Sequence, residues 1–278
     1  MSAAGDLNRE ADLARALARE AGRVILDVYA TDFAVEEKAG GEGPVTQADK
    51  RANALIVGGL RAAFPDDGVV AEESADNRDA GRFTRCWFVD PLDGTREFVA
   101  RNGEFAVHIG LAIAGEVKLG VVFLPVSDKL YTGVVGAGAE LEADGTTRTL
   151  HVSAAARPRE VRLLVSRSHR TKRTEHFCEL AGIPRVIERG SVGLKCGLIA
   201  EGAAEAYVHA SPRSSRWDSC APEAVLKGAG GLMTDLFGEP YRYDGVELRN
   251  LRGLVGSNAT ALPIIRRALD ALLAEGRR

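Results

Sequence analysis

Acidic side chains stand at the ends of apolar segments at three distant points of the chain. Asp90 and Asp93 lie in the run WFVDPLDGT at residues 87–95. Glu72 ends an earlier apolar run, and Asp218 begins an expected helix far downstream. Carboxylates at such buried junctions are costly unless they are paired or bind a metal. Because Mg²⁺ prefers carboxylate and carbonyl oxygens to imidazole or thiolate, these acids together predict a magnesium site.

The spacing of Asp90 and Asp93 suits more than one ion. Across Pro91, a turn can direct both carboxylates and the Leu92 carbonyl toward the same point. Two or three neighbouring Mg²⁺ ions can activate a water and stabilise the leaving oxygen of an in-line displacement. Each acid alone has a simpler explanation, since Asp is common in turns and Asp218 fits a helix cap. Taken together, the acids favour metal-dependent hydrolysis of a phosphate ester.

The residues after this motif, and one before it, extend the predicted site. Gly94 and Thr95 are expected to begin a short helix, whose backbone N–H groups would bind the transferred phosphate. The Thr95 hydroxyl is also placed to orient the attacking water. Asp49 stands in the pattern Thr46-Gln47-Ala48-Asp49. This pattern matches a capping box, so the local sequence alone favours a capping role for Asp49.

Two polar segments of the second half are candidates for holding the rest of the substrate. Ser166 and His169 belong to the run Ser-Arg-Ser-His after an expected strand, where a solvated loop is an equal alternative. Ser191 and Lys195 belong to a glycine-containing helix start that can bind an anion, although such a short run is a weak signal. His108 alternates with apolar residues, which predicts a packed core position.

The elements that must position these residues follow from hydrophobic periodicity. Helices are expected at residues 7–29 and from Thr46 to about 64, and strands at 86–89, 105–114, 117–124 and 130–135, the last three as an antiparallel meander. Residues 136–147 are expected to form a turn-rich tip. The stretch 38–43 is flexible by composition and suited to a lid.

After residue 156 the pattern changes to short strands that alternate with helices. The expected strands are 161–166, 186–188, 205–209, 231–235 and 254–257, and the expected helices are 172–181, 192–201, 218–229 and one that begins at Thr260. We therefore predict an N-terminal α+β domain, residues 1–156, that carries metal-binding acids. An α/β domain, residues 157–278, would complete the site and bind the substrate.

Composition narrows the class of partner. The chain has 278 residues, 45% of them hydrophobic, and a formal net charge of −3, so no basic field is available for long nucleic acids. A small phosphorylated metabolite is compatible with this charge. No apolar run reaches the roughly 18 residues of a membrane span, and the N-terminal segment lacks a secretory pattern. The four cysteines form no CxxC pair, which favours reduced thiols and a cytoplasmic location. A homodimer is compatible with these features.

The motifs AEES at 71–74, DPLDGT at 90–95 and WDSCA at 217–221 resemble those of the inositol monophosphatase superfamily of magnesium-dependent, lithium-sensitive phosphatases. They occur in the family's order and span most of the chain. The resemblance implies a layered α/β/α/β/α sandwich, an α+β fold shared with fructose-1,6-bisphosphatase. The implied metal ligands are Glu72, Asp90, the Leu92 carbonyl, Asp93 and Asp218. Asp49 is implied as a further metal or water-activating residue, Glu72 as a catalytic carboxylate and Thr95 as the residue that orients water.

Within the superfamily, the run TREF at 95–98 resembles the CysQ branch, since inositol phosphatases usually carry Thr-Asn in place of Arg96-Glu97. The segment 210–223 resembles the animal 3'(2'),5'-bisphosphate nucleotidases. Both groups hydrolyse 3'-phosphoadenosine 5'-phosphate to AMP and phosphate. This resemblance implies that Gly94, Thr95, Ser166, His169, Ser191, Lys195 and Asp218 contact the substrate. The lead Ser214-Ser215-Arg216 departs from the family pattern close to the expected nucleoside pocket.

Other functions are compatible with part of this pattern. The nearest alternative is an inositol monophosphatase or another sugar-phosphate phosphatase, which a panel of substrates would separate. Haloacid dehalogenase phosphatases use an Asp nucleophile in a DxDGT motif, but here the two acids are three residues apart and lie mid-chain. A metabolite sensor that binds phosphates without turnover is the non-enzymatic alternative. It is disfavoured because the acids that the mechanism needs are present.

Overall fold

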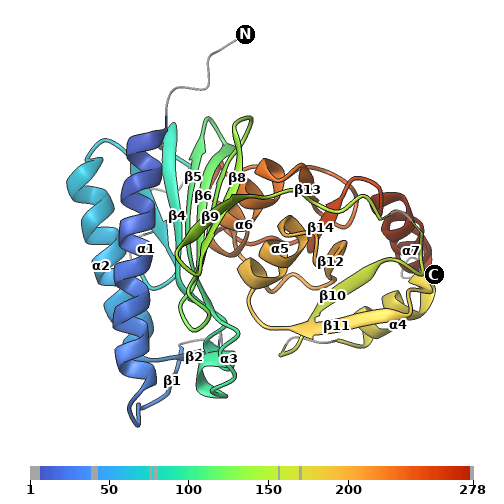
Figure 1. The fold of residues 1–278 in the computed structure, drawn as a ribbon, viewed down its shortest axis with the longest axis horizontal. Helices are drawn as coiled ribbons and strands as arrows, with labels where there is room; N and C mark the ends of the chain where they lie inside the picture. Colours follow the sequence, from blue (N-terminus) through green and yellow to red (C-terminus); the bar gives the residue numbers. More distant parts are fainter. Residues whose placement is uncertain are drawn as a thin grey trace.

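The structure is a computed structural model that describes residues 7–38, 43–74, 77, 81–155, 157–168 and 171–275. Its elements form five layers, in which helices and sheets alternate (Figure 1). In order, the layers contain helices α1 (Asn8–Tyr29) and α2 (Gln47–Ala63), a seven-stranded sheet, helices α5 (Val192–Ala200) and α6 (Arg216–Gly228), a five-stranded sheet, and helices α4 (Lys172–Ala181) and α7 (Leu262–Glu275). The predicted α/β/α/β/α sandwich is therefore confirmed.

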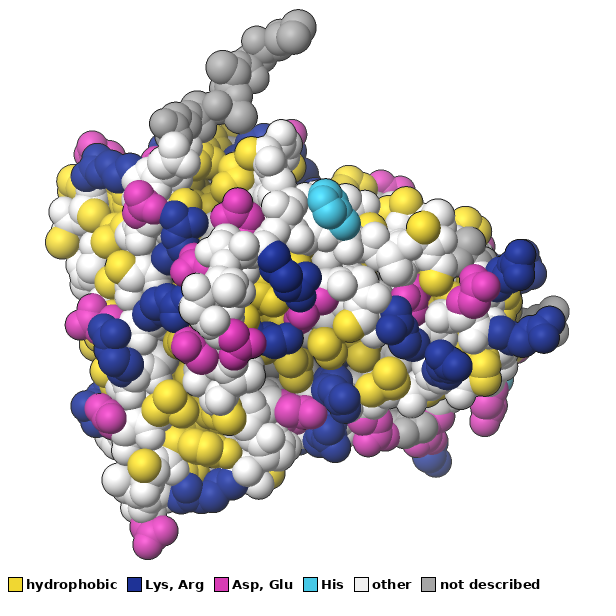
Figure 2. Space-filling view, in the orientation of Figure 1, with side chains coloured by type: hydrophobic (Ala, Val, Ile, Leu, Met, Phe, Trp, Pro, Cys, Tyr) yellow, Lys and Arg dark blue, Asp and Glu magenta, His cyan; other side chains and the backbone are white. Residues whose placement is uncertain are grey.

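Helices α1 and α2, both predicted from the sequence, cover the outer face of the first sheet (Figure 1). The apolar stripe of α1 is buried at helical spacing, for example at Ala14, Ala18 and Ile25. Helix α2 begins at the predicted capping box, in which Thr46 is the N-cap. Among the described residues, none of the helices combines the length and apolar character that crossing a membrane requires. Basic and acidic side chains intermingle over the face shown in Figure 2.

The first sheet consists of β3 (Gly68–Ala71), β4 (Arg85–Asp93), β5 (Ala106–Ile113), β6 (Glu116–Leu124), β7 (Lys129–Val134), β8 (Gly138–Ala143) and β9 (Thr146–Thr149) in that spatial order. Strands β3 and β4 are parallel, and the other neighbours are antiparallel, as expected for the meander. The prediction of a turn-rich tip at 136–147 was wrong. Asp144 and Gly145, both with positive φ, form a tight turn that closes the hairpin of β8 and β9.

Strand β4 is longer than predicted and includes the acidic motif. The sequence suggested a strand that stops at Val89 and is followed by a turn, but β4 continues to Asp93. Its register with β5 shifts between Asp90 and Asp93, where Pro91 has no backbone N–H to donate. This irregularity places both acids at the end of the strand.

Helix α6 reaches the first sheet because three neighbouring strands carry glycine at the contact. Gly110, Gly120 and Gly133 lie opposite one another in β5, β6 and β7. A Cβ atom on Gly120 would lie 2.3 Å from the backbone oxygen of Ala221 in α6. Only glycine permits this approach of helix backbone to sheet. The packing fixes the start of α6, where Asp218 stands.

The second sheet contains β10 (Arg162–Ser166), β11 (Arg185–Arg189), β12 (Ala206–His209), β13 (Gly231–Thr234) and β14 (Leu254–Asn258). Its order is β11-β10-β12-β14-β13, and the first three strands are parallel. The carboxyl ends of β10 and β12 therefore point to the same edge, which places Ser166 and His209 together. The short pair β1 (Glu36–Glu37) and β2 (Pro44–Val45) flanks the predicted lid, whose residues 39–42 lie outside the described residues.

Candidate active site

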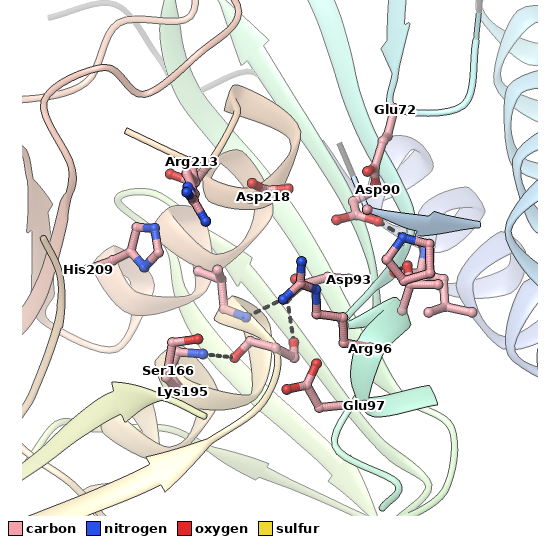
Figure 3. Close-up of a pocket in the computed structure, with 18 of the residues that line it drawn as sticks. Glu72, Asp90, Asp93, Arg96, Glu97, Ser166, Lys195, His209, Arg213 and Asp218 are labelled. Carbon is pink, nitrogen blue, oxygen red and sulfur yellow. Dashed lines mark hydrogen bonds between the residues drawn. The ribbon is translucent and has the colours of Figure 1, made fainter. Parts of the chain in front are cut away.

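A pocket of about 800 Å³, including its open mouth, lies between the two sheets (Figure 3). The short helix α3 (Thr95–Val99) and the first turns of α5 and α6 border it. The predicted residues that line it are Glu72, Asp90, Leu92, Asp93, Gly94, Thr95, Ser166, Ser191, Lys195 and Asp218. Of the other two predicted residues, Asp49 lies behind this lining, and His169 falls outside the described residues.

Three of the acids converge inside the pocket. Glu72, Asp90 and Asp218 each offer a carboxylate oxygen, and these oxygens lie within 4.8 Å of one another. Parallel pairing of β3 with β4 sets Ala71 opposite Val89, so Glu72 and Asp90 follow at the same level of the sheet. Asp218 is the third residue of α6, where its Oδ2 accepts a hydrogen bond of 2.7 Å from the Ser215 N–H. It therefore both caps its helix and belongs to the acidic group.

The electrostatics of this group favour a bound cation. Burial raises the pKa of Asp90 well above its usual range, and the neighbouring Glu72, Asp93 and Asp218 raise it further. Burial likewise raises the pKa of Asp218, with Asp93 and Glu72 adding to the shift. Buried carboxylates of like charge are costly without a counterion. Three convergent oxygen ligands on a rigid strand, turn and helix end fit Mg²⁺.

Asp93 lies outside this group of three and points toward α5. Its Oδ2 accepts a hydrogen bond of 2.6 Å from the Ser191 hydroxyl and another from the Val192 N–H. His108 approaches the same oxygen, with 3.4 Å between its Nε2 and Asp93 Oδ2. The predicted core position of His108 is confirmed, since this side chain is fully buried. One oxygen of Asp93 thus joins the acidic motif to the second half of the chain.

Asp49 is buried and connects the first turn of α2 to Thr95. Its Oδ2 accepts hydrogen bonds of 2.8 and 2.7 Å from the backbone N–H and hydroxyl of Thr46, as the capping box predicted. Its Oδ1 accepts a hydrogen bond of 3.0 Å from the Thr95 hydroxyl. Burial raises the pKa of Asp49, and the hydrogen bonds from Thr46 and Thr95 partly offset this rise. The capping residue is therefore also the partner of the Thr95 hydroxyl at the pocket wall.

The turn before α5 is held in a strained conformation. Ser191 has a φ of 25°, which side-chain-bearing residues rarely adopt. Lys195 is buried, and its Nζ donates hydrogen bonds of 2.5 Å to Gly190 O and 2.8 Å to Ser191 O. Burial lowers the pKa of Lys195. Lys195 and Asp93 together hold this turn against the pocket.

Several residues at the pocket were not singled out from the sequence as site residues. Lys38 pairs with both Glu72 and Glu73, and these acids raise its pKa although burial alone would lower it. Glu97 is buried and accepts a hydrogen bond from the Ser168 hydroxyl, while burial raises its pKa. Arg213 also lines the pocket. Glu97 and Arg213 stand close to recognised motifs, and this position was the available signal, whereas Lys38 belongs to the predicted lid.

Comparisons with known proteins are consistent with this geometry. A family model described as "Inositol monophosphatase family" matches residues 6–275. The "3'(2'),5'-bisphosphate nucleotidase CysQ" of Escherichia coli (strain K12) is 38% identical over 230 residues, which cover 82% of this chain and 91% of that protein. The "Nus factor SuhB" of Salmonella typhimurium (strain LT2) is 32% identical over 228 residues, which cover 80% of this chain and 83% of the relative. A crystal structure of CysQ from Bacteroides thetaiotaomicron aligns with a TM-score of 0.77 at 31% identity, over 91% of this chain and 98% of that one.

Proposed function

The chain belongs to the inositol monophosphatase family, and on this basis we propose that it is a magnesium-dependent 3'(2'),5'-bisphosphate nucleotidase. The reaction is hydrolysis of the 3'-phosphate of 3'-phosphoadenosine 5'-phosphate to AMP and phosphate. The greater identity to a CysQ nucleotidase, 38% against 32% for SuhB, supports this choice of substrate. The observation that carries the chemistry is the convergence of Glu72, Asp90 and Asp218 within 4.8 Å.

In this proposal, Glu72, Asp90, Asp93, Asp218 and the Leu92 carbonyl hold two or three Mg²⁺ ions. Bound Mg²⁺ would neutralise the acids, polarise the phosphoryl oxygens and lower the pKa of a nearby water. Asp93 contributes through its second oxygen, because its Oδ2 is committed to Ser191 and Val192. The buried strand end and helix start hold these ligands in place before substrate binds.

The residues that act on water are Thr95, Asp49 and Glu72. The Thr95 hydroxyl donates to Asp49 Oδ1, so its lone pairs remain available to accept a hydrogen bond from the attacking water. Glu72, which lines the pocket, takes up the proton of that water as its oxygen bonds to phosphorus. The P–O bond to the sugar breaks, and the leaving 3'-oxygen takes a proton from a solvent water to become a hydroxyl of AMP, after which Glu72 returns its proton to solvent.

The substrate side of the pocket comes mainly from the second half of the chain. We assign the transferred phosphate to Gly94 and Thr95, and the nucleotide to Ser166, His169 and Ser191. Lys195 supports substrate binding through the Ser191 turn, because its ammonium group is committed to backbone carbonyls. This division of labour is consistent with the proposed domains, residues 1–156 and 157–278, with Asp218 as the acid that the second domain supplies. We further propose that the protein acts in the cytoplasm.

An inositol monophosphatase is the second candidate function. Solved structures of this fold include the "Thermotoga maritima IMPase TM1415", which aligns with a TM-score of 0.78 at 26% identity. The acidic group and the Thr95–Asp49 pair suit either substrate equally. Only the side of the pocket away from the acidic group can distinguish a nucleotide from an inositol ester.

Phosphate release separates these candidates. The purified protein with Mg²⁺ is supplied with matched concentrations of 3'-phosphoadenosine 5'-phosphate, myo-inositol 1-phosphate and fructose 1,6-bisphosphate. We expect a kcat/KM for the nucleotide at least about tenfold higher, or about 1.4 kcal/mol of transition-state discrimination. Preference for the inositol ester would retain the metal chemistry and overturn the substrate. No turnover of any ester would instead support a phosphate-binding sensor.

A further inference from the structure

Arg213 lies across the pocket from Glu72 and Asp90 (Figure 3). In Figure 3, Glu72 and Asp90 lie on one side, whereas Arg213 and His209 lie on the other. Asp90 lies near the end of β4 and Glu72 directly follows β3 of the first sheet, whereas Arg213 follows β12 of the second sheet. Asp218 lies between them, in the first turn of α6 (Figure 3). A substrate whose reacting phosphate lies at the acids therefore extends toward Arg213.

Most cations of the pocket are already engaged within the protein. Lys38 pairs with Glu72 and Glu73, and Lys195 donates to backbone carbonyls. Arg96 reaches the Ser168 carbonyl at 3.5 Å. By contrast, Arg213 has no hydrogen bond or ion pair with any residue that the structure describes. Its side chain is exposed to the pocket, and a guanidinium stays charged at every physiological pH.

The backbone on both sides of Arg213 is fixed. Before it, His209 is buried, and its Nε2 lies 3.0 Å from the Ser211 hydroxyl. After it, the Ser214 carbonyl accepts a hydrogen bond of 2.8 Å from the N–H of Asn250, which is also buried. Because the loop is already ordered, only the Arg213 side chain has to be immobilised when a ligand arrives, which lowers the ordering cost.

An unpaired guanidinium that extends from a fixed loop opposite a cation site fits a second phosphate group. Arginine binds phosphate through parallel N–H···O contacts, and such charge-assisted bonds are stronger than neutral ones. We propose that Arg213 binds the non-reacting phosphate of the substrate and is the residue that selects bisphosphates over monophosphates. This inference rests on the proposed function for the identity of the ester, but the choice between two phosphates and one is a separate property.

The test compares two nucleotides that differ only in the non-reacting 5'-phosphate. Wild type, Arg213→Gln and Arg213→Lys are assayed with Mg²⁺ on 3'-phosphoadenosine 5'-phosphate and on adenosine 3'-monophosphate. We expect Arg213→Gln to lower the ratio of the two kcat/KM values by roughly 10- to 100-fold, mainly through a higher KM for the bisphosphate. Arg213→Lys keeps the charge and should lose less of the ratio. Arg61→Gln removes an exposed arginine on α2, outside the pocket, and should leave the ratio unchanged.

Two outcomes would overturn the role of Arg213. An equal loss on both nucleotides in Arg213→Gln, or no change on either, would show that it does not read the second phosphate. A different result would overturn the proposed nucleotidase function, namely hydrolysis of inositol esters alone by the wild type. In that case the same ratio, measured with inositol 1,4-bisphosphate and inositol 1-phosphate, decides the role of Arg213. If no ester is hydrolysed, calorimetric binding of the two nucleotides by wild type and Arg213→Gln provides the comparison.

Discussion

Replacement of Asp90 by Asn should stabilise the protein without Mg²⁺ and remove most of the stabilisation that Mg²⁺ provides. Asp90 is buried, and one of its oxygens lies within 4.8 Å of oxygens of Glu72 and Asp218. At an effective dielectric constant of 20, two ionised carboxylates at 4.8 Å repel by about 3.5 kcal/mol. Proton uptake and the nearby Lys38 relieve part of this repulsion. Asn keeps the oxygen that accepts a hydrogen bond of 2.9 Å from the Leu92 N–H, so the fold is retained.

In EDTA we therefore expect Asp90→Asn to raise the free energy of unfolding by about 1 to 3 kcal/mol. For a chain of this size, each kcal/mol corresponds to about 2 to 4 °C in Tm. In Mg²⁺ at about 100 times its Kd, the wild type gains about 2.7 kcal/mol. The variant loses most of this gain and nearly all turnover. Thermal unfolding in EDTA and in Mg²⁺, together with phosphate release, measures all three effects.

Asp235→Asn is the matched control. Asp235 is a buried Asp outside the pocket, and its Oδ2 pairs with Arg252 at 2.8 Å. Its replacement should lower Tm by a similar amount in both buffers and leave the gain from Mg²⁺ unchanged. If Asp90→Asn lowers Tm in EDTA as Asp235→Asn does, or keeps its Mg²⁺-dependent gain, the acidic group is not the metal site.

Three further changes test single contacts. Thr95→Val should lower kcat by about 10² to 10⁴ while keeping the Mg²⁺-dependent gain in Tm, because it removes only the hydroxyl that orients water. Burial alone would raise the pKa of Glu205, but hydrogen bonds from Arg162 outweigh it and the pKa is lowered. Glu205→Gln should therefore destabilise at pH 7, and urea unfolding should show the difference from wild type fading below about pH 4.5 as the native carboxylate is protonated. Gly120→Ala should lower the free energy of unfolding by about 1 to 3 kcal/mol in the same assay, because the added Cβ would clash with α6. Gly58 is an exposed residue of α2, and Gly58→Ala should raise the free energy of unfolding by about 0.5 to 1 kcal/mol.

The sequence predicted those parts of the site that depend on local pattern. Apolar runs that end in acids identified Glu72 and Asp90, and an acid at an expected helix start identified Asp218, because a carboxylate at a strand or helix end is visible in the sequence. The capping box at Thr46 was equally readable. The hairpin of β8 and β9 had an available signal in Asp144-Gly145, which the turn-rich composition of its surroundings obscured.

Other features could not be predicted because they depend on contacts between distant residues. The Ser191 hydroxyl that holds Asp93 comes from a segment 98 positions away. The commitment of Lys195 to backbone carbonyls depends on the strained turn at Ser191, which no short pattern encodes. Likewise, the sequence gives the charge of Arg213 but not the absence of a partner among the described residues. Motifs therefore predict which groups are present, whereas packing decides how each group is used.

Packing also explains how this pocket can select its substrate by length. Helix α6 carries Asp218 in its first turn, and its backbone rests on Gly120 and its neighbours in the first sheet. Asn250 joins the loop after Arg213 to the same helix start, through hydrogen bonds to Ser214 and Ser215. The separation of Arg213 from the acids is therefore set by the contact of helix with sheet. Because the backbone of Arg213 is fixed, its guanidinium reaches only anions within one side-chain length of that point, which favours a substrate whose second phosphate extends there.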